Sequence, residues 1–418
     1  MFRASSLPRV TGDMAGPDDP EGARDAPRES LGELARLFLK LGTIAFGGPA
    51  AHIAMMEDEV VTRRRWLSRQ HFLDLVGATN LIPGPNSTEM TMHVGFERAG
   101  WKGLFTAGAC FILPAVLITG GFAWLYVTYG SLPEVEPFLY GIKPAVIAVI
   151  LGAMWKLGRT AIKGWRFAVL GLGVAAAVLA GLNEVWALLA GGAIGTLWLR
   201  AGGYDSSRTA GVLLPILFLR PSQAAAAGLT TAGALGGVSA AATVSLWKLF
   251  FFFFKVGAIL YGSGYVLVAF LEGGLVQDHG WLTQAELLDA IAIGQFTPGP
   301  VLSTATFIGY VVEGVPGAAV ATLGIFLPSF FFVLILNPLI PRLRESVWLS
   351  AFLDAVNVAA VALMVAVTIE LGVGTLVSWP AWVIAALAAV LALAYRVNAA
   401  WLVAGGAVLG WVLNGWPG

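Results

Sequence analysis

Long apolar runs separated by short polar loops fill the chain beyond residue 30. Lipid offers no partner for unpaired backbone N–H and C=O groups, so every run that enters the hydrocarbon core should be helical. The pattern therefore predicts an all-α polytopic membrane protein. The strongest predicted spans are 103–129, 138–155, 167–182, 185–199, 223–246, 315–337, 349–369, 379–395 and 399–412.

Composition supports this fold class. Of the 418 residues, 57% are hydrophobic and only 12% are charged, which excludes a water-soluble globule. Residues 1–30 carry an unusual share of the charge and no apolar stretch, and we predict a disordered cytoplasmic tail. The formal net charge of zero gives no reason to expect nucleic acid as a partner, and the single Cys110 permits no internal disulfide.

The chain contains two copies of one unit. A shift of 215 positions, which becomes 214 after one deleted residue, aligns residue types that apolar helices rarely share by chance. The aligned residues include Lys40 with Lys255, Gly47 with Gly262, Trp66-Leu67 with Trp281-Leu282, Pro83-Gly84-Pro85 with Pro298-Gly299-Pro300, Gly95 with Gly309, Gly100 with Gly314, and Pro114 with Pro328. We therefore expect a first transporter repeat at 31–208, a linker with one crossing at 209–246, and a second repeat at 247–418.

Charges in equivalent loops indicate that the two copies have opposite orientations. The loop at 57–70 carries four arginines, whereas its counterpart at 272–286 carries Glu272, Asp278 and Glu286 and no Lys or Arg. The next loop reverses this bias, with acids at 134–136 facing Arg342 and Arg344, and so does the third, where the basic stretch 156–166 faces 370–378. Because basic short loops stay in the cytoplasm, the sequence predicts an inverted repeat, a recurring design of secondary transporters.

Each copy opens with two apolar segments that are broken by glycine or proline. The breaks fall at Gly47-Gly48-Pro49 and Pro83-Gly84-Pro85, and again at Gly262-Ser263-Gly264 and Pro298-Gly299-Pro300. Proline removes a backbone donor and glycine permits unusual dihedral angles, so each triplet should end one helix and start another near the bilayer midplane. The segments are either re-entrant hairpins or full crossings, and the loop charges favour hairpins.

Helix starts near the midplane favour an anion site, because each presents free N–H groups and about half a positive charge. Lys40 and Lys255 could add two charges, although both could instead snorkel to the headgroups. The triplets could also be packing kinks. Together the candidate substrate-binding residues are Lys40, Gly47, Gly48, Asn80, Pro83, Gly84, Pro85, Asn86, Ser87, Thr88, Lys255, Gly262, Ser263, Gly264, Gln295, Pro298, Gly299, Pro300, Ser303 and Thr304.

Glu89 and His93 lie four residues apart, on one face of the helix expected after the first P-G-P break. They are candidates for a proton relay, or they pair only with each other. Ser87 with His93 lacks a third group and an oxyanion hole, so we expect no enzyme. We also expect no metal or cofactor.

At these motifs the sequence resembles the chromate ion transporter family in its long, two-domain form. The motifs are Phe46-Gly47-Gly48-Pro49, Trp66-Leu67 and Pro83 to Thr88 in the first copy, and Tyr261 to Tyr265, Gly280 to Thr283 and Ile293 to Pro300 in the second. The resemblance covers nearly all of 33–415 and implies export of chromate from the cytoplasm, chromate resistance, and related activity toward sulfate. Tyr261 and Ser263 depart from the family's Phe-Gly-Gly-Gly pattern.

These inferences predict a multi-pass transporter of the inner (plasma) membrane with a small oxyanion, chromate or sulfate, as its substrate. The lipid bilayer and a second copy of the chain, in a homodimer, are the other candidate partners. The alternatives are an anion channel, a sulfate-type oxyanion transporter, and a membrane scaffold that transports nothing.

Overall fold

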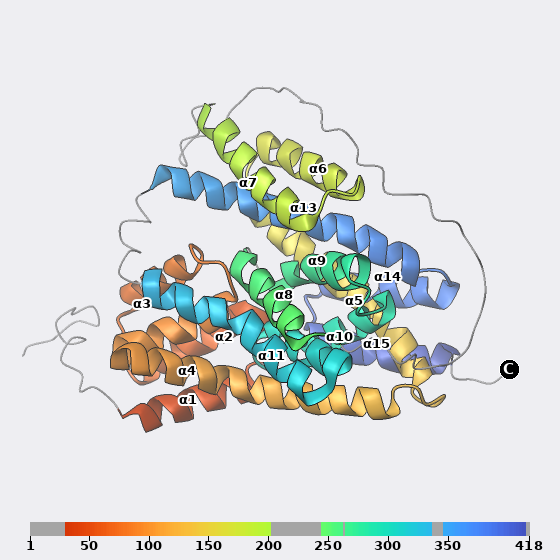
Figure 1. Ribbon diagram of the computed structural model, residues 1–418, viewed down its shortest axis with the longest axis horizontal. Helices are drawn as coiled ribbons and strands as arrows, with labels where there is room; N and C mark the ends of the chain where they lie inside the picture. The colour runs from red at the N-terminus through yellow and green to blue at the C-terminus, as the bar shows by residue number, and fades with distance from the viewer. Residues whose placement is uncertain (1–29, 202–243, 262–263, 337–345, 415–418) are drawn as a thin grey trace, which may run out of the picture.

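The computed structural model describes residues 30–201, 244–261, 264–336 and 346–414, and within these ranges every regular element is helical (Figure 1). Four helices are long and apolar enough to span a bilayer: Asn86–Tyr129, Glu136–Ala161, Val301–Ile335 and Trp348–Thr375. The chain is therefore an all-α, multi-pass membrane protein. The predicted tail at 1–29, most of the predicted crossing at 223–246, and Arg342 and Arg344 lie outside the described residues.

The two copies have corresponding elements in the same order, except that two short helices replace one helix in the second copy and a further short helix precedes its long helix. The first copy comprises α1 (Leu31–Ile44), α2 (Gly48–Glu57), the π-helical turn η1 (Asp58–Arg63), α3 (Arg69–Thr79), α4 (Asn86–Tyr129), α5 (Glu136–Ala161), α6 (Trp165–Leu179) and α7 (Glu184–Ala201). The second comprises α8 (Leu246–Ile259), η2 (Gly264–Val266), α9 (Leu267–Leu271), η3 (Glu272–Asp278), α10 (Gln284–Phe296), η4 (Val301–Ser303), α11 (Thr304–Leu336), α13 (Val347–Thr375), α14 (Trp379–Leu393) and α15 (Ala399–Asn414). Helices end and restart at each predicted break.

Both α4 and α11 are two helices joined by a sharp reversal that the sequence pattern did not predict. The backbone leaves the helical region at Ala99 (φ −142°, ψ 23°) and Gly100 (φ 59°, ψ −148°), and it does so almost identically at Glu313 and Gly314. A Cβ built on Gly103 would lie 2.0 Å from the carbonyl oxygen of Gly95. Eight residues of straight helix would separate them by about 12 Å. The arms 86–98 and 101–129 therefore fold back on each other.

The copies are intertwined. In the first, α5 packs against α14 and α15 of the second, while α13 of the second packs against α6 and α7 of the first. Figure 1 shows α6 and α7 lying along α13. The long helices also meet their counterparts, α4 with α11 and α5 with α13, and one hydrophobic core joins both copies. The breaks of each copy therefore lie against elements of the other copy.

Candidate functional site

The two P-G-P breaks are hydrogen-bonded across the copies. The Gly84 N–H donates to the carbonyl of Leu260 at 2.7 Å, and the Gly299 N–H donates to the carbonyl of Ala45 at 2.9 Å. Ala45 and Leu260 are equivalent by the 215-residue shift. Each break thus ties its own copy to the end of the first helix in the other. In this conformation the two glycine N–H groups are therefore occupied by protein acceptors.

Close approach at these glycines is also between protein groups. Gly84 has φ +141°, and an added Cβ would lie 2.2 Å from Oε1 of Glu89 and 2.4 Å from Oγ of Ser329. At Gly299, with φ +91°, it would lie 3.0 Å from Cβ of Ala115. Ala115 and Ser329 are equivalent by the 214-residue shift. Glycine is required here because the copies meet at these points.

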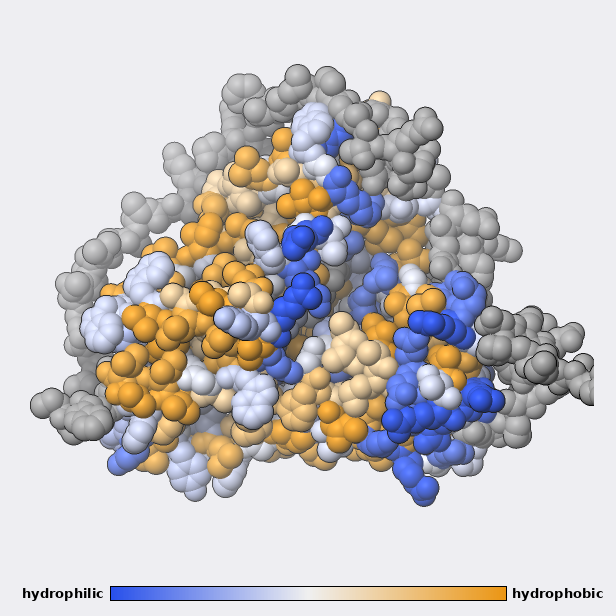
Figure 2. Space-filling view, turned by 180° about the vertical axis from the view of Figure 1, so that it is seen from behind, coloured by the Kyte–Doolittle hydropathy of each residue, from blue (hydrophilic) through white to orange (hydrophobic). Residues whose placement is uncertain are grey.

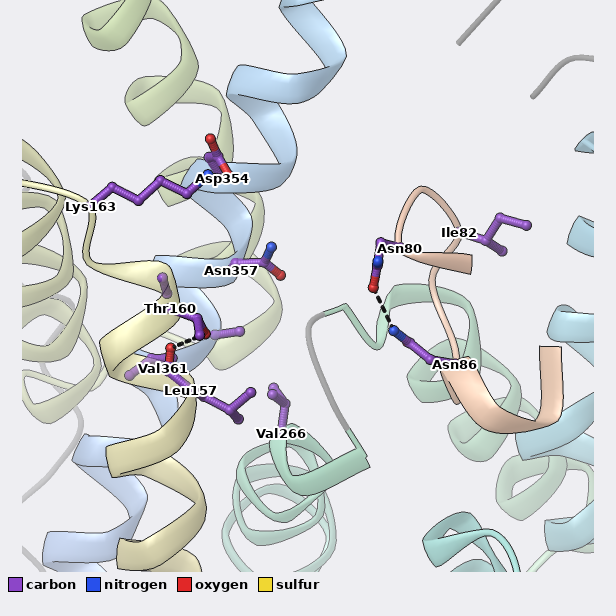
Figure 3. A pocket seen from close by; sticks show the side chains of 12 residues that line it. Asn80, Ile82, Asn86, Leu157, Thr160, Lys163, Val266, Asp354, Asn357 and Val361 are labelled. Atoms are coloured by element: carbon purple, nitrogen blue, oxygen red, sulfur yellow. Dashed lines mark hydrogen bonds and ion pairs between the residues drawn. The ribbon is translucent and has the colours of Figure 1, made fainter. Parts of the chain in front are cut away.

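A polar cavity of about 250 Å³ lies beside the first P-G-P break, and we call it the first-break cavity. Figure 3 shows its two walls: the break contributes Asn80 and Asn86, and the opposite wall contributes residues of α5 and α13. Asn86 Nδ2 donates to Asn80 Oδ1 at 2.7 Å. Lys163, just beyond α5, pairs with Asp354 of α13 at 2.6 Å. The cation is therefore neutralised by its acidic partner, and the remaining polar side chains of the lining are three amides and the hydroxyl of Thr160.

A second cavity of about 270 Å³ lies beside the other P-G-P break, and we call it the second-break cavity. Its lining includes Gln295, Thr297 and Gly299 of the break, and also Gly47, Gly48, Arg396, Asn398 and Ala399. Both α2, which begins at Gly48, and α15, which begins at Ala399, start in its wall. The start of α2 has no side-chain cap, whereas Asn398 Oδ1 accepts a hydrogen bond from the Ala400 N–H at the start of α15. Both helix starts contribute partial positive charge, so this cavity is suited to an anion.

Arg396 brings a full charge to the second-break cavity. It has φ 54°, one of two positive values among the described non-glycine residues, and within the described chain it forms no ion pair. The corresponding loop of the first copy places a glycine, Gly181, in the left-handed region. Left-handed backbone costs a non-glycine residue roughly 1–2 kcal/mol. An arginine in place of the easier glycine points to a role for its side chain.

A third cavity, of about 450 Å³, shares five lining residues with the second-break cavity, including Gly47, Tyr265 and Arg396. To these it adds Lys156 and Arg159 from α5, and we call it the basic vestibule. Its three cations form no ion pairs with other described residues. From behind, Figure 2 shows a column of hydrophilic residues in the middle of the face and a second hydrophilic group on its right, with hydrophobic residues around them. With three cations and no acidic residue in its lining, the basic vestibule is the most positive of the three cavities.

The predicted lysines lie elsewhere and are not among the lining residues of the three cavities. Lys40 pairs with Glu59 of η1 at 2.7 Å, and its side chain is 52% exposed. Its ammonium, with help from Arg64, holds the pKa of Glu59 below its usual range. The Lys255 ammonium lies 5.8 Å from the ring centroid of Phe252. The structure thus gives both lysines protein partners in place of a shared position at the breaks.

The remaining candidates fall into three groups. Ser87, Thr88, Ser303 and Thr304 are buried at the helix starts, where Ser303 accepts a hydrogen bond from Thr119 at 3.1 Å and Thr304 donates to a carbonyl of η4. Glu89 is wholly buried beside the hydroxyl of Ser329, and among the described residues it makes no hydrogen bond to His93. Gly262 and Ser263 lie outside the described residues, and Gly264 opens η2.

A model of the chromate transporter family matches the chain twice, at residues 32–196 and 247–411. The chain belongs to the chromate transporter family. Among its relatives are a chromate transport protein of Cupriavidus metallidurans, 31% identical with 93% of this chain and 94% of the relative covered, and one of Pseudomonas aeruginosa, 32% identical with 84% and 85% covered. A probable chromate transport protein of Synechococcus elongatus is 31% identical, with 87% and 90% covered. No solved structure matches the chain.

For this member of the chromate transporter family, sequence reasoning missed the residues that make the cavity lining basic. In the sequence, Lys156 and Arg159 follow an apolar run, so they indicated only which side of the membrane the end of that run faces. Arg396 and Asn398 occupy a short polar break between two apolar runs, where an isolated arginine was the available signal. Their shared cavity depends on α5 of one copy packing against α14 and α15 of the other.

Proposed function

We propose that this protein exports chromate from the cytoplasm across the plasma membrane and thereby confers chromate resistance. The observation that carries the proposal is the second-break cavity with its basic vestibule. Two helix starts supply about one positive charge between them, and Arg396 in the cavity wall supplies another. Together they match the two charges of a tetrahedral dianion. The names of three relatives, each a chromate transport protein, favour chromate as that dianion.

The direction of transport rests on an inverted arrangement of the two copies. In this topology the arginine loop at 63–69, the end of α5 and the loop between α14 and α15 all face the cytoplasm. Two observations support it. Lys156 and Arg159 share one cavity with Arg396, as a common side requires. Gln277 donates to Glu272 at 2.7 Å and to Glu370 at 3.1 Å, gathering acidic residues that the topology assigns to the outside. The basic vestibule then opens toward cytoplasmic anions.

The membrane potential favours export. A dianion that leaves an inside-negative cell gains about 4.6 kcal/mol per 100 mV, twice the value for a single charge. Import of the same ion would oppose the field. The vestibule would raise the local concentration of oxyanions on the side from which they depart. Export by an alternating-access carrier, with re-entrant breaks near the midplane, is consistent with the P-G-P segments that join the copies.

The test is chromate uptake into inside-out vesicles that contain the full chain. We expect saturable uptake and expect Arg396→Gln to raise the half-saturating chromate concentration at least tenfold, because the charge facing the dianion is lost. The matched control is Arg65→Gln, since Arg65 is the other described non-glycine residue with positive φ and lies in the exposed loop after η1. Equal uptake by both variants would refute the assigned site.

Competition and kinetics separate the alternatives. Sulfate that displaces chromate at similar concentrations would indicate a general oxyanion transporter. Flux that rises linearly without saturation would indicate a channel, and no flux with correctly inserted protein would indicate a scaffold. A homodimer stays a prediction, to be checked by the mass of the purified protein in detergent.

A further inference from the structure

Glu89 breaks the symmetry of the two copies at the point where they meet. The 214-residue shift aligns it with Ser303 and the 215-residue shift with Thr304, so the second copy has a hydroxyl at this place in either register. Both hydroxyls are buried like Glu89 and have hydrogen-bond partners within the protein. In the second copy, a hydroxyl is therefore sufficient for packing and for helix capping at this position. The carboxyl of the first copy requires a separate explanation.

Among the described residues, no Lys or Arg forms an ion pair with Glu89. From α11 of the second copy comes the hydroxyl of Ser329, which lies beside the carboxyl and the first P-G-P break. From the end of α8 comes the titratable phenol of Tyr261. Along α4 the next titratable groups on this face are His93 and, another turn on, Glu97. That Ser329 hydroxyl is the one hydrogen-bonding group beside the carboxyl among the described residues, and no ion pair to Glu89 exists there. Burying an ionised carboxylate in such a place is costly, so the conformation described here suits the neutral acid.

Glu89 also lies close to the path proposed for the oxyanion. Asn86 lines the first-break cavity, and Glu89 follows three residues later on the same helix, about 4.5 Å along its axis. The short helix η2 separates the two break cavities, because Tyr265 lines the second and Val266 lines the first. A dianion that passes from the vestibule side into the first-break cavity would come within a helical turn of Glu89. An ionised carboxylate there would repel it.

We propose that Glu89 is a proton-binding site that is linked to oxyanion transport, with the oxyanion entering the first-break cavity only when the Glu89 carboxyl carries a proton. This inference rests on the proposed function. The proton comes from water when the copies separate enough to expose the carboxyl, and it returns to water in the same way. Binding of the dianion and binding of the proton then strengthen each other, as reciprocal linkage requires. The protein would act as a proton-linked oxyanion carrier, and the membrane potential would then drive the export of one net negative charge per cycle instead of two.

Chromate binding to the purified full-length protein in lipid nanodiscs tests this linkage, measured by calorimetry at pH values where chromate is wholly the dianion. For the wild type, we expect the affinity for chromate to fall about tenfold per pH unit once the pH exceeds the pKa of Glu89 in the chromate-free protein. This is the pH dependence that one linked proton produces. Chromate binding should also withdraw protons from a weakly buffered solution that contains a pH dye. Glu89→Gln should bind chromate with a pH-independent affinity and withdraw no protons, because the amide is neutral at every pH. Glu89→Asp should restore both signals.

The matched control is Glu97→Gln, the same substitution two turns along α4. Glu97 is partly exposed and lies 3.4 Å from His71, so its removal should leave the pH dependence of chromate binding intact. A wild type that binds chromate without pH dependence or proton uptake would overturn the linkage alone. Retention of both signals by Glu89→Gln would overturn it as well. A wild type that binds no chromate at all would instead overturn the proposed function, and this inference with it.

Discussion

Single residues at the breaks show how one backbone geometry can serve different purposes. Glycine at 84 and 299 allows the two copies to touch, whereas glycine at 100 only allows a left-handed turn: an added Cβ at Gly100 meets nothing within 4 Å. Arg396 adopts the same left-handed region without being glycine, next to the proposed anion site. Strained or crowded positions in this protein therefore differ in cause, and substitution can separate backbone strain from steric contact.

Alanine at Gly84, Gly299 and Gly100 should lower thermal stability to different extents. All three substitutions place alanine at a positive φ that L residues rarely adopt, which costs about 1–3 kcal/mol at each position. Gly84→Ala adds contacts at 2.2 and 2.4 Å with Glu89 and Ser329, and Gly299→Ala adds only milder contacts at 3.0 Å and 3.1 Å. We expect Tm to fall most for Gly84→Ala, less for Gly299→Ala and least for Gly100→Ala, measured by thermal unfolding in detergent. A fall at Gly100 as large as that at Gly84 would contradict the assigned contact.

Among the helices, each first helix lies directly against the long arm that follows the reversal. A Cβ at Gly42 of α1 would lie 2.4 Å from the carbonyl oxygen of Phe111, and one at Gly257 of α8 would lie 2.3 Å from that of Ile325. These are equivalent positions in the two copies. Small residues permit such backbone contact between membrane helices, where dispersion and weak hydrogen bonds replace the hydrophobic effect. Helix packing thus explains the aligned glycines at 42 and 257.

Glycine-to-alanine substitution should have opposite effects at two positions in the α1–α4 pair. Gly42→Ala should destabilise the protein, because the methyl group forces α1 away from Phe111. Gly120→Ala in α4 meets nothing within 4 Å and should be neutral or stabilising, since alanine gains up to about 1 kcal/mol in helix propensity. The measurement is the fraction of protein that stays monodisperse after heating, read by size-exclusion chromatography. Similar losses for both variants would argue against close packing at Gly42.

Across the whole molecule, local pattern predicted the elements and their breaks but not their partners. Apolar runs gave the helices, and the P-G-P triplets gave their interruptions, because both depend on neighbours in sequence. The packing of α6 and α7 against α13, and of α14 and α15 against α5, depends on contacts between segments that are distant in the sequence. For the same reason Lys40 could not be seen to face Glu59, nor Arg396 to share a cavity with Lys156. Gly100 and Gly314, where the long helices reverse, are aligned by the repeat, but the alignment alone does not show that the backbone turns back at them.

The orientation of the copies gives the last prediction. Replacing Cys110 with alanine leaves the chain without cysteine, and single cysteines can then be placed at Arg65 and Asp278. Both positions are exposed, and they lie in equivalent turns, with Gly280 taking the left-handed backbone that Arg65 has in the first copy. If the copies are inverted, an impermeant thiol reagent added to intact cells should label Asp278→Cys and spare Arg65→Cys. Inside-out vesicles should show the reverse. Labelling of both from one side would mean that the copies run parallel, so the basic vestibule and the acidic residues around Glu272 would no longer be assigned to opposite faces of the membrane.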